Sequence, residues 1–207
     1  MDEDKRKKLR KEQTADLYRA VGEFTVKFEH TCHALQTAII FMLHKAGLQQ
    51  QSVAHVILAG LTAEPLKALF AALVAETQAL DDDERKIVDG ALNRFITLAE
   101  KRNVIIHATW FIGWGNEQTT DFSTASAIKF HKTKQGAAYK LPKYTVKDFA
   151  EVTAEATGLA NIFQRLNACF LGGFKIAKNF SVESDGTVSV PSPNASTGNL
   201  IAQQDAE

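Results

Sequence analysis

The 207-residue chain has little of several features that define specialised protein classes. It has only two cysteines, Cys32 and Cys169, and they stand far apart, which excludes a disulfide framework and a CxxC zinc knuckle. Its positive and negative charges cancel to a formal net charge of zero, so no global positive field attracts nucleic acid. Any binding of nucleic acid must therefore depend on a local basic patch.

Long apolar runs are also missing. Lys, Glu or His interrupts every apolar stretch well before the roughly 18 residues that a membrane-spanning helix needs. The highly charged residues 1–13 lack the apolar segment of a signal peptide. We therefore expect a cytoplasmic protein that stays out of the membrane and keeps both thiols reduced.

The residues that are present predict a mainly α-helical fold. Apolar residues make up 45% of the chain, which is enough to form the core of one domain. Apolar side chains recur at spacings of three and four, which is typical of helices packed on one face. The expected helices cover residues 14–45, 50–60, 63–79, 81–102 and 145–178. We expect a helical domain over 14–180, a charged arm over 1–13 and a mostly disordered tail over 181–207 with a short strand near 187–190.

Residues 108–143 interrupt the helical pattern. Trp110 to Ile112, Ser126 to His131 and Ala137 to Leu141 have extended character, with turn-forming residues between them. The pattern predicts a small β-hairpin or meander before the last long helix. We expect Trp110 and Trp114 to pack in the core beneath this hairpin, with a pocket for a nucleobase as the alternative.

Arg102, Asn103 and His107 are the candidate catalytic residues. Cleaving RNA without a metal needs a base that takes the 2′-OH proton and an acid that protonates the leaving 5′-oxygen. Imidazole suits both tasks because it titrates near neutral pH. Arg102 would stabilise the charge that develops on the phosphate, and the amide of Asn103 would orient the phosphate or the imidazole.

The spacing of these residues leaves two arrangements open. Residues four apart share one face of a helix, whereas residues five apart point about 140° away from each other. Asn103 and His107 therefore align, but Arg102 and His107 do not meet on a straight helix. Either the helix ends or bulges within Val104–Ile106, which its β-branched residues favour, or a symmetric dimer brings two Arg and two His together.

The segment LAEKRNVIIHATW resembles the motif of the HEPN family, an Arg-x4–6-His pattern with a polar residue after the Arg. The resemblance extends over roughly 14–180, although its specific part is about ten residues long. It implies an up-down helical bundle and a homodimer with a composite active site at Arg102, Asn103 and His107. It also implies metal-independent RNA cleavage to a 2′,3′-cyclic phosphate without a cofactor, often in a toxin or antiviral-defence effector with an antitoxin or regulatory partner.

The chain departs from one HEPN subgroup, in which a Tyr two residues after the His is modified by a nucleotidyltransferase. Thr109 stands at that position, which puts this form of control in doubt. The alternative function is a non-catalytic, HEPN-like dimerisation or binding module for a protein or nucleotide partner. A third hypothesis is a helical dimer with a purely structural role.

Two further groups of residues bear on the site. Lys129, His131, Lys132 and Lys134 lie in the extended insert with Phe130 and Tyr139 among them, which indicates either an RNA-binding patch or a hairpin edge that its lysines protect from strand pairing. Glu29 is expected to support the motif by holding Arg102. A metal site at Glu29 and His33 is disfavoured, since their order does not match a zinc-protease motif.

Overall fold

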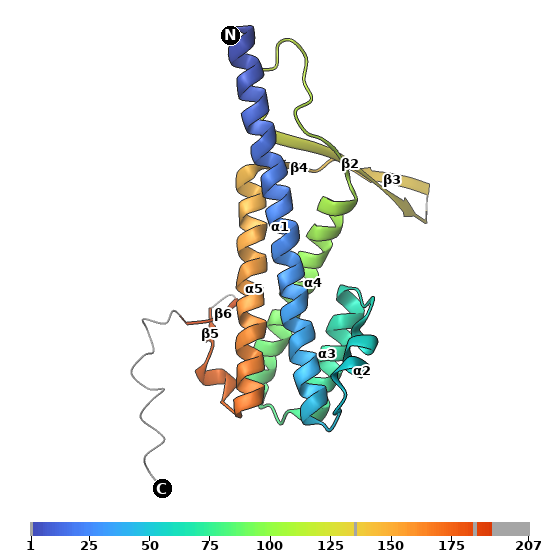
Figure 1. The fold of residues 1–207 in the computed structure, drawn as a ribbon, viewed down its shortest axis with the longest axis vertical. Coiled ribbons are helices and arrows are strands. Elements are labelled where there is room, and N and C mark those ends of the chain that lie inside the picture. The colour runs from blue at the N-terminus through green and yellow to red at the C-terminus, as the bar shows by residue number, and fades with distance from the viewer. Residues whose placement is uncertain (1, 135, 184–185, 192–207) are drawn as a thin grey trace. The chain divides into compact units, whose positions relative to one another are not determined.

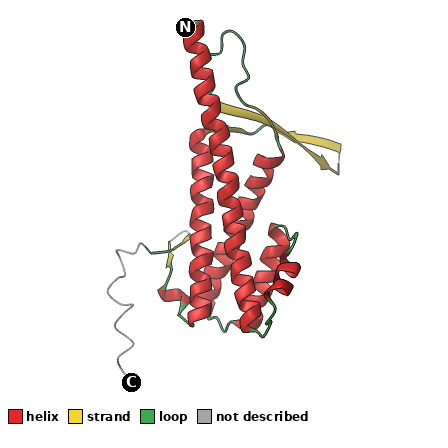
Figure 2. Ribbon diagram, viewed as in Figure 1, coloured by secondary structure: helices red, strands yellow, loops and turns green. Residues whose placement is uncertain are grey.

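The computed structural model describes residues 2–134, 136–183 and 186–191 (Figure 1). The fold is mainly helical with a small β insert, as the sequence predicts (Figure 2). The elements are, in chain order, α1 (Glu3–Lys45), α2 (Gln51–Leu58), α3 (Ala63–Thr77), α4 (Asp82–His107), β1 (Thr109–Phe111), β2 (Thr124–Thr133), β3 (Gly136–Lys140), β4 (Lys143–Thr145), α5 (Val146–Gly172), the 3-10 helix η1 (Ile176–Lys178), β5 (Ser181–Val182) and β6 (Val188–Ser189). Among these described helices, none is long and apolar enough to span a bilayer.

The chain divides into two compact units. The first contains the described residues of Met1–Thr31 and Thr97–Thr157, and the second contains those of Cys32–Ile96 and Gly158–Glu207. Helices α1, α4 and α5 contribute residues to both units. The candidate catalytic residues and the β insert belong to the first unit.

The core of the first unit contains apolar residues of α1 and aromatic residues near the insert. Phe24 of α1 and Phe149 of α5 are fully buried. Burying such a side chain completely contributes roughly 1.5–3 kcal/mol. The Trp110 indole N–H donates to the Ile105 carbonyl at 2.7 Å, and its ring lies 5.7 Å from that of Tyr144. These contacts hold β1 against the last turns of α4.

Helix α5 begins with a reciprocal pair of side-chain caps. The Thr145 backbone N–H and hydroxyl both donate to the Asp148 carboxylate at 2.7 Å, and the Asp148 N–H donates back to the Thr145 hydroxyl at 3.3 Å. These hydrogen bonds satisfy donors that a helix N-terminus otherwise leaves unpaired. They also lower the pKa of Asp148, because they stabilise its charged form.

Strand β2 organises the β insert. Its first half pairs antiparallel with β1 and with β4, and Ser126 faces both Phe111 and Lys143 across the two pairings. Its second half pairs with β3 to form a hairpin in which Phe130 faces Tyr139. The hairpin projects away from the helices of its unit (Figure 1), and its residues are largely exposed.

The second unit has an aromatic core that spans three helices. The ring of Phe163 on α5 lies 6.1 Å from that of Phe70 on α3 and 5.8 Å from that of Phe95 on α4, both in edge-on geometry. Edge-on contacts of this kind add roughly 0.5–1.5 kcal/mol beyond the buried area.

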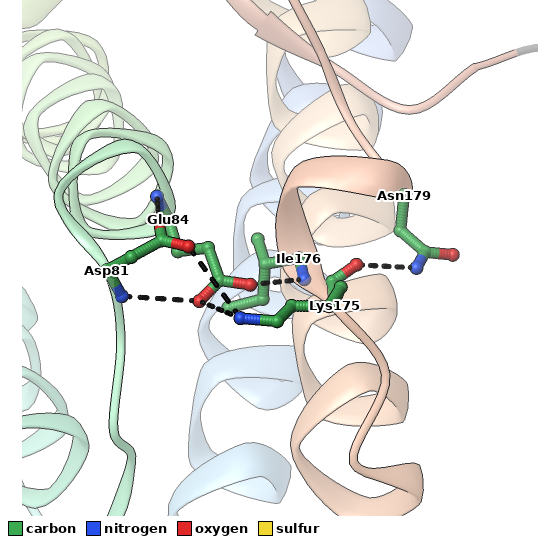
Figure 3. A network of polar contacts seen from close by, with 5 residues as sticks. All are labelled: Asp81, Glu84, Lys175, Ile176 and Asn179. Atoms are coloured by element: carbon green, nitrogen blue, oxygen red, sulfur yellow. Dashed lines mark hydrogen bonds and ion pairs between the residues drawn. The ribbon is translucent and has the colours of Figure 1, made fainter.

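A buried carboxylate ties the start of α4 to the segment after α5 (Figure 3). Glu84 is only 3% exposed and accepts hydrogen bonds from the backbone N–H groups of Ile176 at 2.9 Å and Asp81 at 3.3 Å. The Glu84 N–H in turn donates to the Asp81 carboxylate at 2.9 Å, and Lys175 lies 4.0 Å from Glu84. Asp81 therefore caps the start of this helix, and Glu84 closes the capping box.

Three of the expected boundaries differ from the structure. Helix α1 begins at Glu3, so most of the charged arm is helical. Helix α5 ends at Gly172 instead of continuing to 178, because Gly173 adopts a left-handed φ of 67° and the Phe174 N–H bonds back to the Cys169 carbonyl at 3.0 Å. The strand expected near 187–190 is β6, and residues 192–207 of the expected disordered tail lie outside the described part.

The third difference affects the motif directly. Helix α4 was expected to end near Arg102, but it continues through Val104–Ile106 to His107. The β-branched residues stay helical because Ile105 is buried, with only 1% of its surface exposed. The packing around this side chain outweighs the small intrinsic penalty that β-branched residues have in a helix.

Candidate active site

Arg102 lies on α4 against the face of α1. Its guanidinium is 3.4 Å from a Glu29 carboxylate oxygen and 5.7 Å from the centre of the Phe28 ring. The expected contact with Glu29 is thus present, and the phenyl face adds a cation–π contact. The Arg102 side chain is 26% exposed and that of Glu29 is 57% exposed. The Glu29 side of this ion pair is exposed, and exposed ion pairs contribute at most about 1 kcal/mol.

Asn103 and His107 occupy the exposed end of α4. Their spacing of four residues places them on one face of the continuous helix, and both are exposed to solvent. His107 is the last helical residue of α4. This end of α4 presents an amide and an imidazole that a polyanion can reach.

One chain does not bring Arg102 and His107 to the same face. Because α4 neither ends nor bulges within Val104–Ile106, the two side chains leave the helix about 140° apart. The expectation of a local break was therefore wrong. The other arrangement that the spacing left open, in which two chains contribute to one site, stays a prediction.

The hairpin touches the motif through Lys129. Its ammonium group donates to the Asn103 carbonyl at 2.6 Å, which holds a positive charge beside the end of α4. The other expected RNA-binding residues, His131, Lys132 and Lys134, lie exposed further along the hairpin. The structure therefore brings Lys129 to the motif and leaves the other three on the projecting part of the hairpin.

The two tryptophans behave differently. Trp110 packs against Tyr144 and Phe149, as expected. Trp114 is 73% exposed and contacts Phe111, with ring centres 5.0 Å apart, so core packing was a wrong prediction for this residue. It follows the turn at Gly113, where the chain leaves the sheet.

Sequence reasoning missed the two aromatic contacts made by arginines in this unit. The spacing of apolar residues on α1 gave no sign that Arg102 lies over the ring of Phe28. Arg10 of the charged arm lies 5.7 Å from the Phe122 ring, while Arg6 donates to the Thr119 carbonyl at 3.0 Å and also to that of Asn116. The arm therefore holds the loop between β1 and β2, a role that its charge pattern does not reveal.

The hollows in the described surface do not involve the motif, and no metal-binding cluster is found among the described residues. Two hollows of about 210 and 240 Å³ open in the second unit, and the residues that line them do not include the motif. Within the described ranges, no cluster of three or more His, Cys, Asp or Glu side chains is arranged to hold a metal ion.

Comparison of the chain with family models, with curated proteins and with solved structures finds no match.

Proposed function

We propose that this protein is a metal-independent endoribonuclease of the HEPN type whose active site forms between two chains. The observation that carries the proposal is the solvent-exposed end of α4. There Asn103 and His107 share one face, and Lys129 places a positive charge beside the Asn103 carbonyl. An accessible imidazole among cationic and amide groups fits the chemistry of RNA transesterification.

The reaction needs only protein side chains and RNA. One His107 takes the proton from a ribose 2′-OH, and the 2′-oxygen attacks the adjacent phosphorus. Arg102 stabilises the charge on the phosphoryl oxygens, releasing Glu29 as it does so. The second His107 gives a proton to the departing 5′-oxygen, which leaves a 2′,3′-cyclic phosphate on one product and a 5′-OH on the other.

Two chains are needed to supply one His107 as the general base and another as the general acid. A single chain has one His107 and directs Arg102 to another side of α4. A two-fold axis beside the end of α4 would bring a second His107 and a second Arg102 to the same phosphate. The toxin or antiviral-defence role and an antitoxin partner belong to the same proposal through the HEPN resemblance.

A second candidate function is a non-catalytic binding module for a protein or nucleotide. The observation that favours it is the occupied guanidinium of Arg102, which is already held by Glu29 and Phe28. In that case the motif stabilises the joint between α1 and α4, and the exposed end of α4 serves only for binding.

The two candidates are separated by a cleavage assay in EDTA on a mixed-sequence RNA. Wild type is compared with His107→Ala and Arg102→Ala, and with His55→Ala and Arg19→Ala as matched controls at exposed positions away from the motif. Circular dichroism verifies that each variant is folded.

The nuclease proposal expects the two motif variants to lose at least about a hundredfold in rate, since each removes a general acid–base or a charge stabiliser. The controls should cut like wild type, and the products should carry a 2′,3′-cyclic phosphate. If folded wild-type protein leaves the RNA intact, or if His107→Ala cuts as fast as wild type, the nuclease proposal is wrong and the binding module becomes the better account.

A further inference from the structure

The β2–β3 hairpin concentrates positive charge in a chain whose net charge is zero. Residues 122–146 contain no Asp or Glu, although the whole chain has 24 acidic residues. The same segment contains five lysines and one histidine, which are Lys129, Lys132, Lys134, Lys140, Lys143 and His131. A segment with this charge and no carboxylate of its own is complementary to a polyanion.

Two aromatic rings lie among these basic residues. Phe130 is 72% exposed and Tyr139 is 63% exposed, and they face each other across the hairpin. Directly opposed residues lie on the same face of a β-ladder, as do residues two apart on one strand. Lys132 therefore shares the face of the two rings, while Lys129, His131 and Lys140 lie on the opposite face.

We infer that this hairpin face is a platform for single-stranded RNA, on which Phe130 and Tyr139 stack unpaired bases while Lys132 and Lys134 bind the phosphates. Exposed rings interspersed with lysines are the combination that single strands require, because every base has a face that can stack. The choice of RNA over DNA rests on the proposed function. The inference adds to that proposal that the substrate of the nuclease is unpaired RNA.

A base-paired duplex fits this surface less well. In a duplex the base faces are covered by their neighbours, so Phe130 and Tyr139 would find no stacking partner. Only the lysines would then contribute, and binding would be weaker and purely electrostatic.

An anionic membrane is the other polyanionic surface that basic hairpins meet. Insertion into lipid would need apolar residues at the tip of the hairpin, but the described tip residues are Thr133, Lys134 and Gly136. The rings of Phe130 and Tyr139 lie behind these residues, so burying them in lipid would also bury Lys132 and Lys134 at high cost.

The hairpin also leads to the motif. Lys129 begins the paired part of the hairpin and donates to the Asn103 carbonyl at 2.6 Å. Phe130 follows Lys129 directly in β2, so the stacking face begins one residue beyond the contact with Asn103, on the opposite face of the ladder. The platform would therefore hold an unpaired segment near the exposed end of α4.

The test measures binding separately from cleavage by using His107→Ala as the parent protein. Fluorescence anisotropy reports the binding of a labelled oligouridylate of about 12 nucleotides, with an RNA duplex of equal length and phosphatidylcholine–phosphatidylserine vesicles as competing probes. Phe130→Ala and Tyr139→Ala remove the rings, Phe130→Tyr keeps one, and Trp114→Ala removes an exposed ring outside the hairpin. Lys132→Ala is paired with Lys86→Ala, which changes an exposed lysine elsewhere.

We expect each ring-to-alanine change to weaken oligouridylate binding by about tenfold or more, while Phe130→Tyr and Trp114→Ala bind like the parent. Lys132→Ala should reduce the slope of log affinity against log salt by about 0.7, and Lys86→Ala should leave it unchanged. Equal binding by Phe130→Ala, Tyr139→Ala and the parent, or a preference for duplex or vesicles over oligouridylate, would overturn the inference. If otherwise wild-type protein fails to cut RNA but the ring variants lose binding, the platform stands and the nuclease proposal alone falls.

Discussion

Single polar side chains fix the beginnings of two helices in this protein. Glu84 joins the start of α4 to η1 through two backbone N–H groups, and Asp148 caps α5 together with Thr145. Both carboxylates replace water as the acceptor of backbone donors. Their contributions should nevertheless differ, because Glu84 is buried whereas Asp148 lies near the surface.

Replacing Glu84 should destabilise the protein more than replacing its exposed neighbour. Glu84→Ala leaves the buried Ile176 N–H without an acceptor, and we expect a loss of about 2–4 kcal/mol in the free energy of unfolding. The control Asp83→Ala removes an exposed ion pair with Lys86 and should cost less than about 1 kcal/mol. Urea denaturation of both variants measures the difference, and similar losses would mean that Glu84 does not hold η1 in place.

The cap of α5 should make stability depend on pH in the acid range. The hydrogen bonds from Thr145 lower the folded-state pKa of Asp148 below its ordinary value of 3.8. Its stabilising effect is therefore complete above pH 3.8 and is lost as the pH falls through the lowered pKa. The difference in unfolding free energy between wild type and Asp148→Asn should shrink as the pH falls below 3.8. A difference that stays constant or grows would contradict this role for the carboxylate.

At the scale of elements, two glycines of the first unit should respond oppositely to the same substitution. Gly22 lies within α1 with open space around it, so Gly22→Ala should stabilise the protein by about 0.5–1 kcal/mol. Gly113 has a φ of 71°, and an added Cβ would come 2.7 Å from the Thr14 hydroxyl. Gly113→Ala should therefore cost about 1–3 kcal/mol, and thermal unfolding that shows the same sign for both changes would refute the turn geometry after β1.

The sequence predicts the type of each element better than its ends. The regular apolar spacing on α1 and α5 and the extended character of β2 and β3 were enough to locate these elements. The end of α4 was missed because Val104–Ile106 is β-branched, and local preference alone favours a strand there. What keeps the segment helical is the burial of Ile105, which depends on residues distant in the sequence.

The candidate site was also predicted only in part from the sequence. Arg102, Asn103 and His107 could be chosen from their chemistry, and the support of Arg102 by Glu29 was also expected. The spacing alone could not decide between a broken helix and a second chain, because that choice depends on whether α4 continues. Nor could it reveal the contact between Lys129 and Asn103, which requires the base of the hairpin to lie beside the end of α4.

For the whole molecule, the proposed composite site needs two chains. A continuous α4 separates Arg102 from His107, so cleavage by a single chain would leave the imidazole without its cationic partner. Light scattering of the purified protein should give about twice the chain mass of 22.8 kDa under conditions in which it cuts RNA. An active species with the mass of one chain would contradict the composite site.

The most direct test of the composite site is a mixing experiment between wild type and His107→Ala. The two proteins are exchanged into mixed dimers at equal amounts, and RNA cleavage is measured in EDTA at constant total protein. If one site needs the His107 of both chains, only dimers of two wild-type chains cut, and the rate should fall to about a quarter of the wild-type value. A fall to about one half would show that each chain acts alone, and an absence of cleavage by wild type itself would contradict the nuclease account altogether.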